Sequence, residues 1–173
     1  ELEKHFPLDG MSSAFFSSRR AIVIGNYTYT DSEFKVGPED TVSVYGTTTQ
    51  PAGNFFRDGS QLTGQSNHLV NLQLGLEQNG RLSQQTLMLA YASDRVTSRG
   101  AAGLPDIYES PGLRVDIVWR EGFTFFQQDM EAKFEARNIL GQEYEEFQQR
   151  EGNIVYYNKY DIGTSFNLSI TMD

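Results

Sequence analysis

Clustered carboxylates are the side chains in this sequence that could do chemistry, because grouped carboxylate oxygens bind Ca²⁺. Two stretches hold them, one with Asp31, Glu33, Glu39 and Asp40 and the other with Glu143, Glu145 and Glu146. Neither stretch has the regular ligand spacing of an EF-hand loop. A solvated acidic surface is therefore the favoured interpretation, and we predict no metal site.

The other reactive residues are isolated. His5 and His68 lie far apart, and Ser93-Asp94 has no histidine nearby to complete a catalytic triad. The sequence contains no glycine-rich nucleotide motif and no HExxH zinc motif. We expect no catalytic residue and no cofactor, and we expect that the protein is not an enzyme.

The composition fits one domain with an acidic surface. The chain has 173 residues, no cysteine and a net charge of −9, with 14 basic against 23 acidic residues. Such a charge disfavours nucleic acid as a partner. No apolar run approaches the roughly 18 residues of a membrane-spanning helix. Strands that cross a membrane alternate apolar and polar residues, so they give a weak signal in such a scan.

Glycine, proline and asparagine divide the chain into extended segments, which predicts an all-β fold. We expect strands at 18–32, 67–77, 82–95, 111–121, 128–139 and 156–172, with the end of a further strand at 1–6. Long connections at 33–66, 96–110 and 140–155 alternate with short ones at 78–81 and 122–127. This is typical of an antiparallel transmembrane β-barrel with long extracellular loops and short periplasmic turns. Asn79-Gly80 predicts a type I′ turn in the first short connection.

The predicted strands have one apolar and one polar face, since strand side chains alternate in direction. In 67–77 the two faces hold Val70, Leu72, Leu74 and Leu76 against Asn71, Gln73, Gly75 and Glu77. Two neighbouring strands predict ladders of opposite charge, with Arg114, Asp116 and Arg120 beside Glu131, Lys133, Glu135 and Arg137. In a barrel these charges must face the lumen, because an Arg or Lys facing lipid at mid-membrane costs roughly 2–4 kcal/mol.

Aromatic residues form two groups. The short-turn side holds Phe15, Phe16, Trp119, Phe123, Phe125 and Phe126, and the long-loop side holds Tyr27, Tyr29, Tyr91, Tyr108, Tyr156, Tyr157 and Tyr160. Two aromatic bands around an aliphatic zone are typical of membrane barrels. Alternation alone does not say which face lies inside, so it leaves a soluble barrel open.

Five stretches follow one another along the chain: LTGQSNHLVNLQLGLE (62–77), LSQQTLMLAYASDRVTSRG (82–100), PDIYESPGLRVDIVWREG (105–122), EAKFEARNILGQEYEEFQ (131–148) and YDIGTSFNLSI (160–170). In this order they resemble the C-terminal barrel strands of TonB-dependent outer-membrane receptors. The resemblance is strong over about 62–172 and weaker over 1–61, and it rests on the five stretches together.

The resemblance implies a larger barrel of about 22 strands with a plug in its lumen. Residues 1–173 would be the last six or seven strands, with the plug domain and the earlier strands outside this sequence. The implied function is import of a scarce nutrient, such as a ferric siderophore, a cobalamin or a glycan, across the outer membrane of a Gram-negative bacterium. The implied partners are the rest of the barrel and its plug, the TonB complex, outer-membrane lipid and an extracellular small-molecule or glycan ligand. The residues that bind this ligand are left unassigned.

Two alternatives from other classes stay open. The first is a self-contained outer-membrane barrel of about eight strands, which requires a strand in 1–10 and another in 41–56. The second is a soluble lipocalin-like ligand-binding β domain, in which the leucine faces turn inward. The position of the leucine faces relative to water discriminates between these classes.

Overall fold

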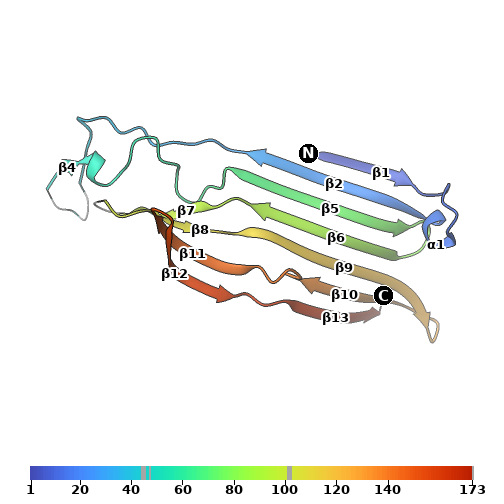
Figure 1. The fold of residues 1–173 in the computed structure, drawn as a ribbon. Helices are drawn as coiled ribbons and strands as arrows, with labels where there is room; N and C mark the ends of the chain where they lie inside the picture. Colours follow the sequence, from blue (N-terminus) through green and yellow to red (C-terminus); the bar gives the residue numbers. More distant parts are fainter. Residues whose placement is uncertain (44–45, 47, 101–102, 173) are drawn as a thin grey trace.

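A computed structural model shows an all-β chain built from two antiparallel sheets and one short strand pair (Figure 1). The structure describes residues 1–43, 46, 48–100 and 103–172. The larger sheet has the order β1 (Leu2–Pro7), β2 (Arg19–Tyr29), β5 (His68–Gln78), β6 (Ser83–Ala92), β9 (Gly112–Phe125), β10 (Gln128–Arg137) and β13 (Ser165–Met172). The all-β antiparallel prediction is therefore confirmed.

The smaller sheet has four strands, and they extend the larger one. Its order is β12 (Asn153–Asp161), β11 (Glu143–Arg150), β8 (Ile107–Glu109) and β7 (Arg95–Ser98). Each of these strands is separated from a strand of the larger sheet by a short break, at 93–94, 110–111, 138–142 or 162–164. Figure 1 shows the two sheets end to end along the molecule. We call the region of the four breaks the junction.

Short elements occupy the remaining connections. These are α1 (Ala14–Ser17), β3 (Thr41–Val42), β4 (Gln50–Pro51) and η1 (Ala52–Asn54), of which β3 and β4 pair only with each other. The connection from 30 to 67 is long, as predicted, although residues 44, 45 and 47 lie outside the described part. Within the described residues, no helix is long and apolar enough to cross a membrane.

Two predicted loops are wrong. Residues 96–110 contain β7 and β8, and residues 140–155 contain β11 and the start of β12. The predicted strand at 156–172 is also wrong, because it is two strands, β12 and β13, broken at 162–164. These segments lack regular alternation. Their strands pair locally in the β7/β8 and β11/β12 hairpins, and across a long sequence separation where β8 pairs with β11. Residues 140–155 are therefore mostly an extended hairpin, and residues 96–110 have short strands at their two ends.

The predicted type I′ turn at Asn79-Gly80 is wrong as well. Glu77 pairs with Gln84, which leaves a longer connection in which Gly80 has φ 74° and Asn79 has a negative φ. The Asn79 N–H donates to the Ser18 carbonyl at 3.2 Å, so the start of this turn is tied to the segment before β2.

The backbone signature of a type I′ turn occurs in two other hairpins. Phe126-Gln127 joins β9 to β10 with φ values of 47° and 61°, and Glu151-Gly152 joins β11 to β12 with φ values of 51° and 84°. Positive φ at both central residues is what this turn requires. Asn-Gly is the usual sequence for it, so neither hairpin carries the expected signal.

The register across the larger sheet confirms the two predicted faces. One continuous row across six strands is apolar, and it consists of Val23, Leu74, Leu87, Ile117, Ala136 and Phe166. Another row points to the opposite side, and it consists of Arg20, Glu77, Gln84, Arg120, Lys133 and Ser169. We call the two sides of the larger sheet the apolar face and the polar face.

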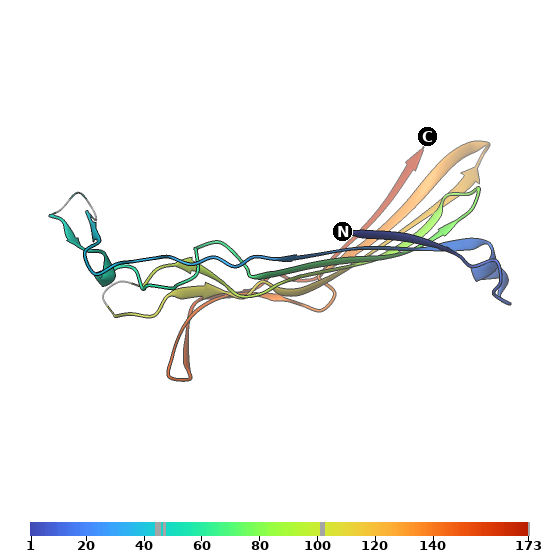
Figure 2. The same cartoon turned by 90° about the horizontal axis from the view of Figure 1, so that it is seen from above.

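Neither face is covered by another layer. Figure 2, seen from above, shows a single thin layer from which the β11/β12 hairpin projects. The buried apolar residues among those described are Ala52, Val96, Val115 and Ala136. The solvent-accessible surface is 11686 Å², against roughly 8,600 Å² expected for a compact monomer of this mass. The apolar face therefore does not form a core within this chain.

Candidate functional site

Ion pairs connect the strands on the polar face. Arg120 donates two hydrogen bonds to Glu131 on the next strand, at 2.7 and 2.9 Å, and Arg20 pairs with Glu77 at 2.7 Å. Lys133 pairs with Glu135 along its own strand at 2.6 Å. The predicted ladder of opposite charge is thus confirmed for Arg120 with Glu131.

The polar face also carries an open cavity. A cavity of about 520 Å³ lies over β5, β6, β9 and β10, and its nine lining residues all come from the polar face. Side chains of four adjacent strands therefore share one hollow on the polar side.

The junction is held by Asn138, which is only 3% exposed and has a left-handed backbone with φ 54°. Its side-chain amide donates to the carbonyls of Gln142 and Gly163, both at 3.0 Å, and its oxygen accepts from the Gln142 N–H at 2.9 Å. Its own N–H donates to Asp116 at 2.7 Å. One asparagine thus links the ends of β10, β11 and β13 with β9.

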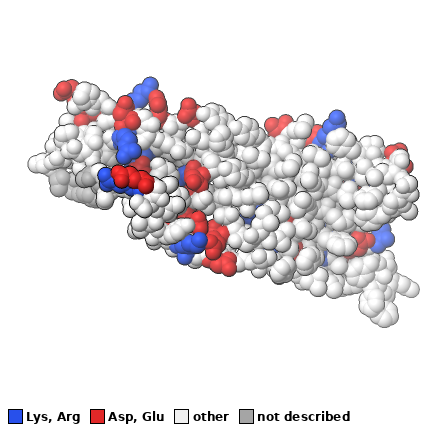
Figure 3. Space-filling model, in the orientation of Figure 1, with Lys and Arg blue, Asp and Glu red and all other residues white. Residues whose placement is uncertain are grey.

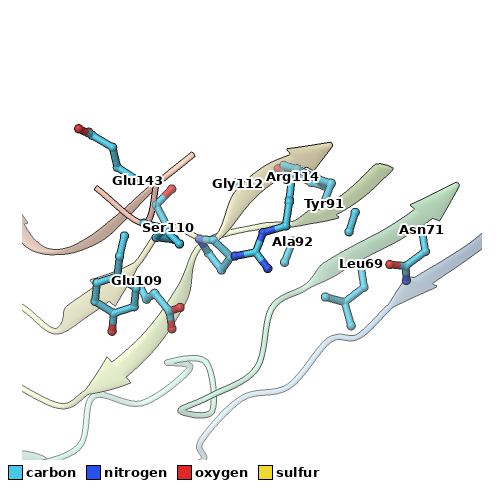
Figure 4. Close-up of a pocket in the computed structure, with 13 residues that line it drawn as sticks. Leu69, Asn71, Tyr91, Ala92, Glu109, Ser110, Gly112, Arg114 and Glu143 are labelled. Atoms are coloured by element: carbon cyan, nitrogen blue, oxygen red, sulfur yellow. The ribbon is translucent and has the colours of Figure 1, made fainter. Parts of the chain in front are cut away.

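A second cavity, of about 320 Å³, lies beside this junction (Figure 4). We call it the junction hollow. Its apolar lining comes from Leu69, Ala90, Ala92, Pro111, Gly112 and Ile162, its polar lining comes from Asn71, Glu109, Ser110, Arg114, Glu143 and Tyr144, and Tyr91 adds a residue of the apolar face. The pairs Leu69–Ala92, Asn71–Ala90 and Ala90–Arg114 place this part of the lining on the polar face.

Gly112 is required where the wall of the hollow turns. It has φ 63°, and a Cβ at this position would lie 2.6 Å from the Gln142 side chain. Any larger residue would meet both the strained backbone and that contact. The glycine therefore lets β8 pass into β9 close against the 138–142 segment.

Arg114 is the charged group directed into the hollow. Figure 4 shows its guanidinium lying among the side chains of the cavity. It makes no hydrogen bond or ion pair with any residue that the structure describes. Asp116, two residues along the same face, accepts the Asn138 N–H instead. The predicted place of Arg114 in the charge ladder is therefore wrong.

The two acidic groups of the hollow are each paired with a base. Glu109 accepts two hydrogen bonds from Arg95, at 2.8 and 3.0 Å, and Glu143 pairs with Lys159 at 2.7 Å. Hydrogen bonding to Glu109 raises the pKa of Arg95, and hydrogen bonds to Glu143 and Glu145 raise the pKa of Lys159. Both carboxylates thus have a basic partner, which Glu143 shares with Glu145, and Arg114 is the cation of the lining that has no acidic partner among the described residues.

Tyr144 supplies an aromatic wall. Its ring stacks on Tyr160 with centroids 4.9 Å apart. Burial, followed by a hydrogen bond to Glu146, raises the pKa of the Tyr144 hydroxyl. Tyr144 therefore stays neutral over a wider pH range than an ordinary tyrosine and offers a flat uncharged surface.

Charged side chains gather at one end of the molecule. In the view of Figure 3 they lie mainly over the four-stranded sheet and the long 30–67 connection, and the area over the larger sheet is mostly uncharged. The acidic stretches singled out in the sequence belong to this end. Glu143 and Glu145 share Lys159, and Asp40 accepts the Gly37 N–H at 2.7 Å. Within the described residues, no three His, Asp or Glu side chains are grouped as metal ligands.

The isolated reactive residues do not come together either. His68 lies 2.9 Å from the Tyr27 hydroxyl through Nδ1, and His5 pairs with Glu3. Ser93 accepts the His68 backbone N–H through its hydroxyl at 3.1 Å, so its contact with His68 does not involve the imidazole. This arrangement offers no activated nucleophile.

Sequence reasoning missed the isolation of Arg114 and the hydrogen bonds by which Asn138 holds the junction. Both residues were placed inside regular alternation, and neither carries a motif. The sequence signal near Arg114 is Pro111, and the signal near Asn138 is Gly141. Proline and glycine both interrupt the hydrogen-bond ladder of a strand, so they mark the two strand breaks beside these residues.

Comparison with known proteins gives no relative: no family model, no curated protein and no solved structure matches the chain.

Proposed function

We propose that this chain is part of the wall of a TonB-dependent outer-membrane receptor, the C-terminal portion of its β-barrel, which imports a scarce nutrient into a Gram-negative cell. The observation that carries the proposal is a single-layer sheet with one face that is apolar and uncovered and an opposite face that holds ion pairs. The resemblance of five sequence stretches to that receptor family supports the choice of class.

Strand length supports a membrane span. The strands β2, β5, β6 and β10 have 11, 11, 10 and 10 residues, and a membrane-crossing strand needs about 9–11. Leu74 and its neighbours in the apolar row are then in contact with acyl chains. Burial of that row in lipid supplies the hydrophobic stabilisation that this chain lacks by itself.

The aromatic residues support the same orientation. Trp119, Phe123 and Phe125 lie at the short-turn end of β9, and Tyr27, Tyr29 and Tyr91 lie at the other end of the larger sheet. The other four tyrosines of the predicted long-loop group lie in the four-stranded sheet: Tyr108, Tyr156, Tyr157 and Tyr160. The aromatic band at the long-loop end of the larger sheet therefore has fewer residues than the sequence predicts. Aromatic bands at both ends of the apolar zone fit the two membrane interfaces.

The open edges of the sheet favour a large barrel over the eight-stranded alternative. Within the described residues, β1 and β13 each pair on one side only. An eight-stranded barrel needs a strand from 41–56 in the main sheet, and β3 and β4 pair with each other outside it. In lipid an unpaired strand edge costs several kcal/mol for each backbone group. Both edges are therefore expected to pair with further strands of a larger barrel.

The lipocalin-like alternative has less support, because it needs the apolar face inside. Closure with the polar face inward, the side on which the ion pairs and the cavity of about 520 Å³ lie, encloses charges. The enclosed space is then a polar lumen, as a transport barrel with a plug requires.

The proposed orientation is tested by single cysteines at Leu72, Gln73 and Leu74, which is possible because the chain has no cysteine of its own. In the membrane-inserted receptor we expect a water-soluble maleimide to label position 73 and to spare positions 72 and 74. Nitroxide-bearing lipids should quench a fluorophore at 72 or 74 and leave one at 73 unaffected. Equal labelling at all three positions would rule out the membrane orientation.

The transport step is tested in cells. Loss of the gene that encodes this chain should abolish uptake of one labelled nutrient among ferric siderophores, cobalamins and oligosaccharides. Deletion of TonB should have the same effect. Uptake that depends on this gene and continues without TonB would exclude the TonB-dependent mechanism and leave passive diffusion through the barrel.

A further inference from the structure

We propose that the junction hollow binds the anionic end of the ligand, with Arg114 holding a carboxylate or phosphate group and the apolar wall holding a flat organic body. This inference rests on the proposed function for its location, since that function makes the polar face the interior of the barrel. It goes beyond that function because it assigns a binding residue and a chemical class.

The charge of Arg114 is the first reason. A guanidinium presents several N–H donors in one plane and binds carboxylate or phosphate through two parallel hydrogen bonds. The other arginines near the junction are already paired, Arg95 with Glu109 and Arg99 with Asp106 at 2.7 Å. Arg114 alone among these three has no ion-pair partner within the described residues.

The surroundings of Arg114 favour an anionic ligand group over a cationic one. Both carboxylates of the hollow are held by Arg95 and Lys159, so they do not compete strongly for Arg114. Asp116 is held by the backbone of Asn138. Arg114 is thus the one cation in the lining of the hollow, and no carboxylate among the described residues takes up its donors.

The lining sets the rest of the ligand. Leu69, Ala90 and Ala92 form an apolar strip beside the guanidinium, and Pro111 and Ile162 complete it. Tyr144 adds a ring face that remains uncharged. A cavity of about 320 Å³ lies at the lower end of the usual range for small-molecule sites. It therefore suits one ring system with an acidic substituent, or one such portion of a larger ligand.

The position of the hollow suits capture of a ligand that arrives from outside. It lies where the polar face of the larger sheet meets the four-stranded sheet, between residues of β5, β6, β9 and β11. In the proposed orientation this is the extracellular mouth of the barrel. Asn138 and Gly112 hold the two strand breaks that form its wall, so the cavity is built by fixed backbone.

The test uses the complete membrane-extracted receptor that contains this chain, and the probes are 1-naphthoate, 1-naphthyl phosphate and uncharged 1-naphthamide. In equilibrium dialysis we expect at least one of the two anions to bind and the amide to bind at least tenfold more weakly. Arg114→Gln should weaken binding of that anion about tenfold or more, and Arg114→Lys should restore part of it. The anion that binds more tightly identifies carboxylate or phosphate as the preferred group.

Arg137→Gln is the matched control, because Arg137 lies on the same face, carries the same charge and does not line the hollow. It should leave binding within about twofold of the wild type. The proposal is overturned if neither anion binds, or if Arg114→Gln and Arg137→Gln weaken binding equally. These outcomes do not depend on cysteine labelling or TonB-dependent uptake, so the assignment of Arg114 and the proposed function can fail separately.

Discussion

Each of the four strands of the smaller sheet continues a strand of the larger sheet, yet the side chains of the two sheets are distributed differently. In the larger sheet, side chains alternate between an apolar and a polar face across six strands. In the smaller sheet, all nine residues of β12 are exposed, and ion pairs and tyrosines predominate. A strand can therefore continue in direction while its surroundings change completely.

The two regions also differ in what stabilises them. The larger sheet has an uncovered apolar face, which is stabilised by contact with an apolar medium, and its ion pairs lie on the polar face. The smaller sheet holds pairs such as Arg95 with Glu109 and Lys159 with Glu145, which remain favourable in water. The difference places the boundary between lipid and water at the junction, in the proposed orientation, and it can be tested by substitutions on each side.

The largest effect is expected from a charge on the apolar face of the larger sheet. Leu74→Arg should destabilise the membrane-inserted receptor by roughly 2–4 kcal/mol, the cost of an arginine facing lipid at mid-membrane. Gln73→Arg, one residue away on the polar face, should change stability by much less. Urea unfolding in lipid vesicles measures both.

The same substitution in the smaller sheet sharpens the comparison. Val155 in β12 is 66% exposed, more than Leu74 at 39%. Exposed to water, Val155→Arg should change stability by no more than about 0.5 kcal/mol. Equal losses for Leu74→Arg and Val155→Arg would mean that both sheets have the same surroundings, and the boundary at the junction would be wrong.

A smaller effect, of about 2 kcal/mol, is expected at the junction itself. Asn138→Ala removes three side-chain hydrogen bonds and leaves the N–H of Gln142 and the carbonyl of Gly163 without their partner. The β11 and β12 amides should then exchange with deuterium faster, while those of β5 and β6 keep their protection. Hydrogen exchange followed by mass spectrometry resolves the two sets.

Asn138→Gly separates the two roles of this residue. Glycine accepts the left-handed backbone of position 138 at no steric cost, so any loss that remains in this variant comes from the hydrogen bonds. We expect Asn138→Gly to exchange faster than the wild type and slower than Asn138→Ala. Uniform acceleration over both sheets would contradict a local role for Asn138 and indicate that the two sheets unfold as one unit.

The faces of the larger sheet could be predicted because each depends on local alternation alone. Leu72 and Leu74 point to one side whatever strand lies beside them, and the register then brings the apolar residues of neighbouring strands together. In a single-layer sheet no second layer can change this pattern.

The smaller sheet could not be predicted because its short strands lack regular alternation and its turns lack the usual sequence signal, so only the pairing itself defines them. β7 is paired through Arg95 with Glu109, and β11 with β12 through a turn at Glu151-Gly152 that lacks the usual Asn-Gly sequence. The sequence did not show that Arg114 lacks a partner, because Asp116 accepts a hydrogen bond from the backbone N–H of Asn138 instead, and these two residues are 22 positions apart.

The smallest effect is expected from pH, and it should be confined to the smaller sheet. Lys159 lies at 2.7 Å from Glu143 and 2.6 Å from Glu145, and these hydrogen bonds raise its pKa. A base whose pKa is raised on folding stabilises the fold fully below its unfolded-state pKa, about 10.4 for lysine. This contribution is lost as the pH rises through the higher pKa of the folded state.

The titration of Lys159 can be followed by NMR of its ¹³Cε in the folded receptor, and its midpoint should lie above the ordinary lysine value. Glu145→Gln should lower that midpoint, because the variant retains a hydrogen-bond acceptor and removes the charge. Glu151→Gln, at the turn of the same hairpin, should not shift it, since Glu151 does not pair with Lys159. If Glu151→Gln lowered the midpoint as much as Glu145→Gln, the general negative charge of the hairpin would be the cause, and the specific pairing that distinguishes the smaller sheet would be absent in solution.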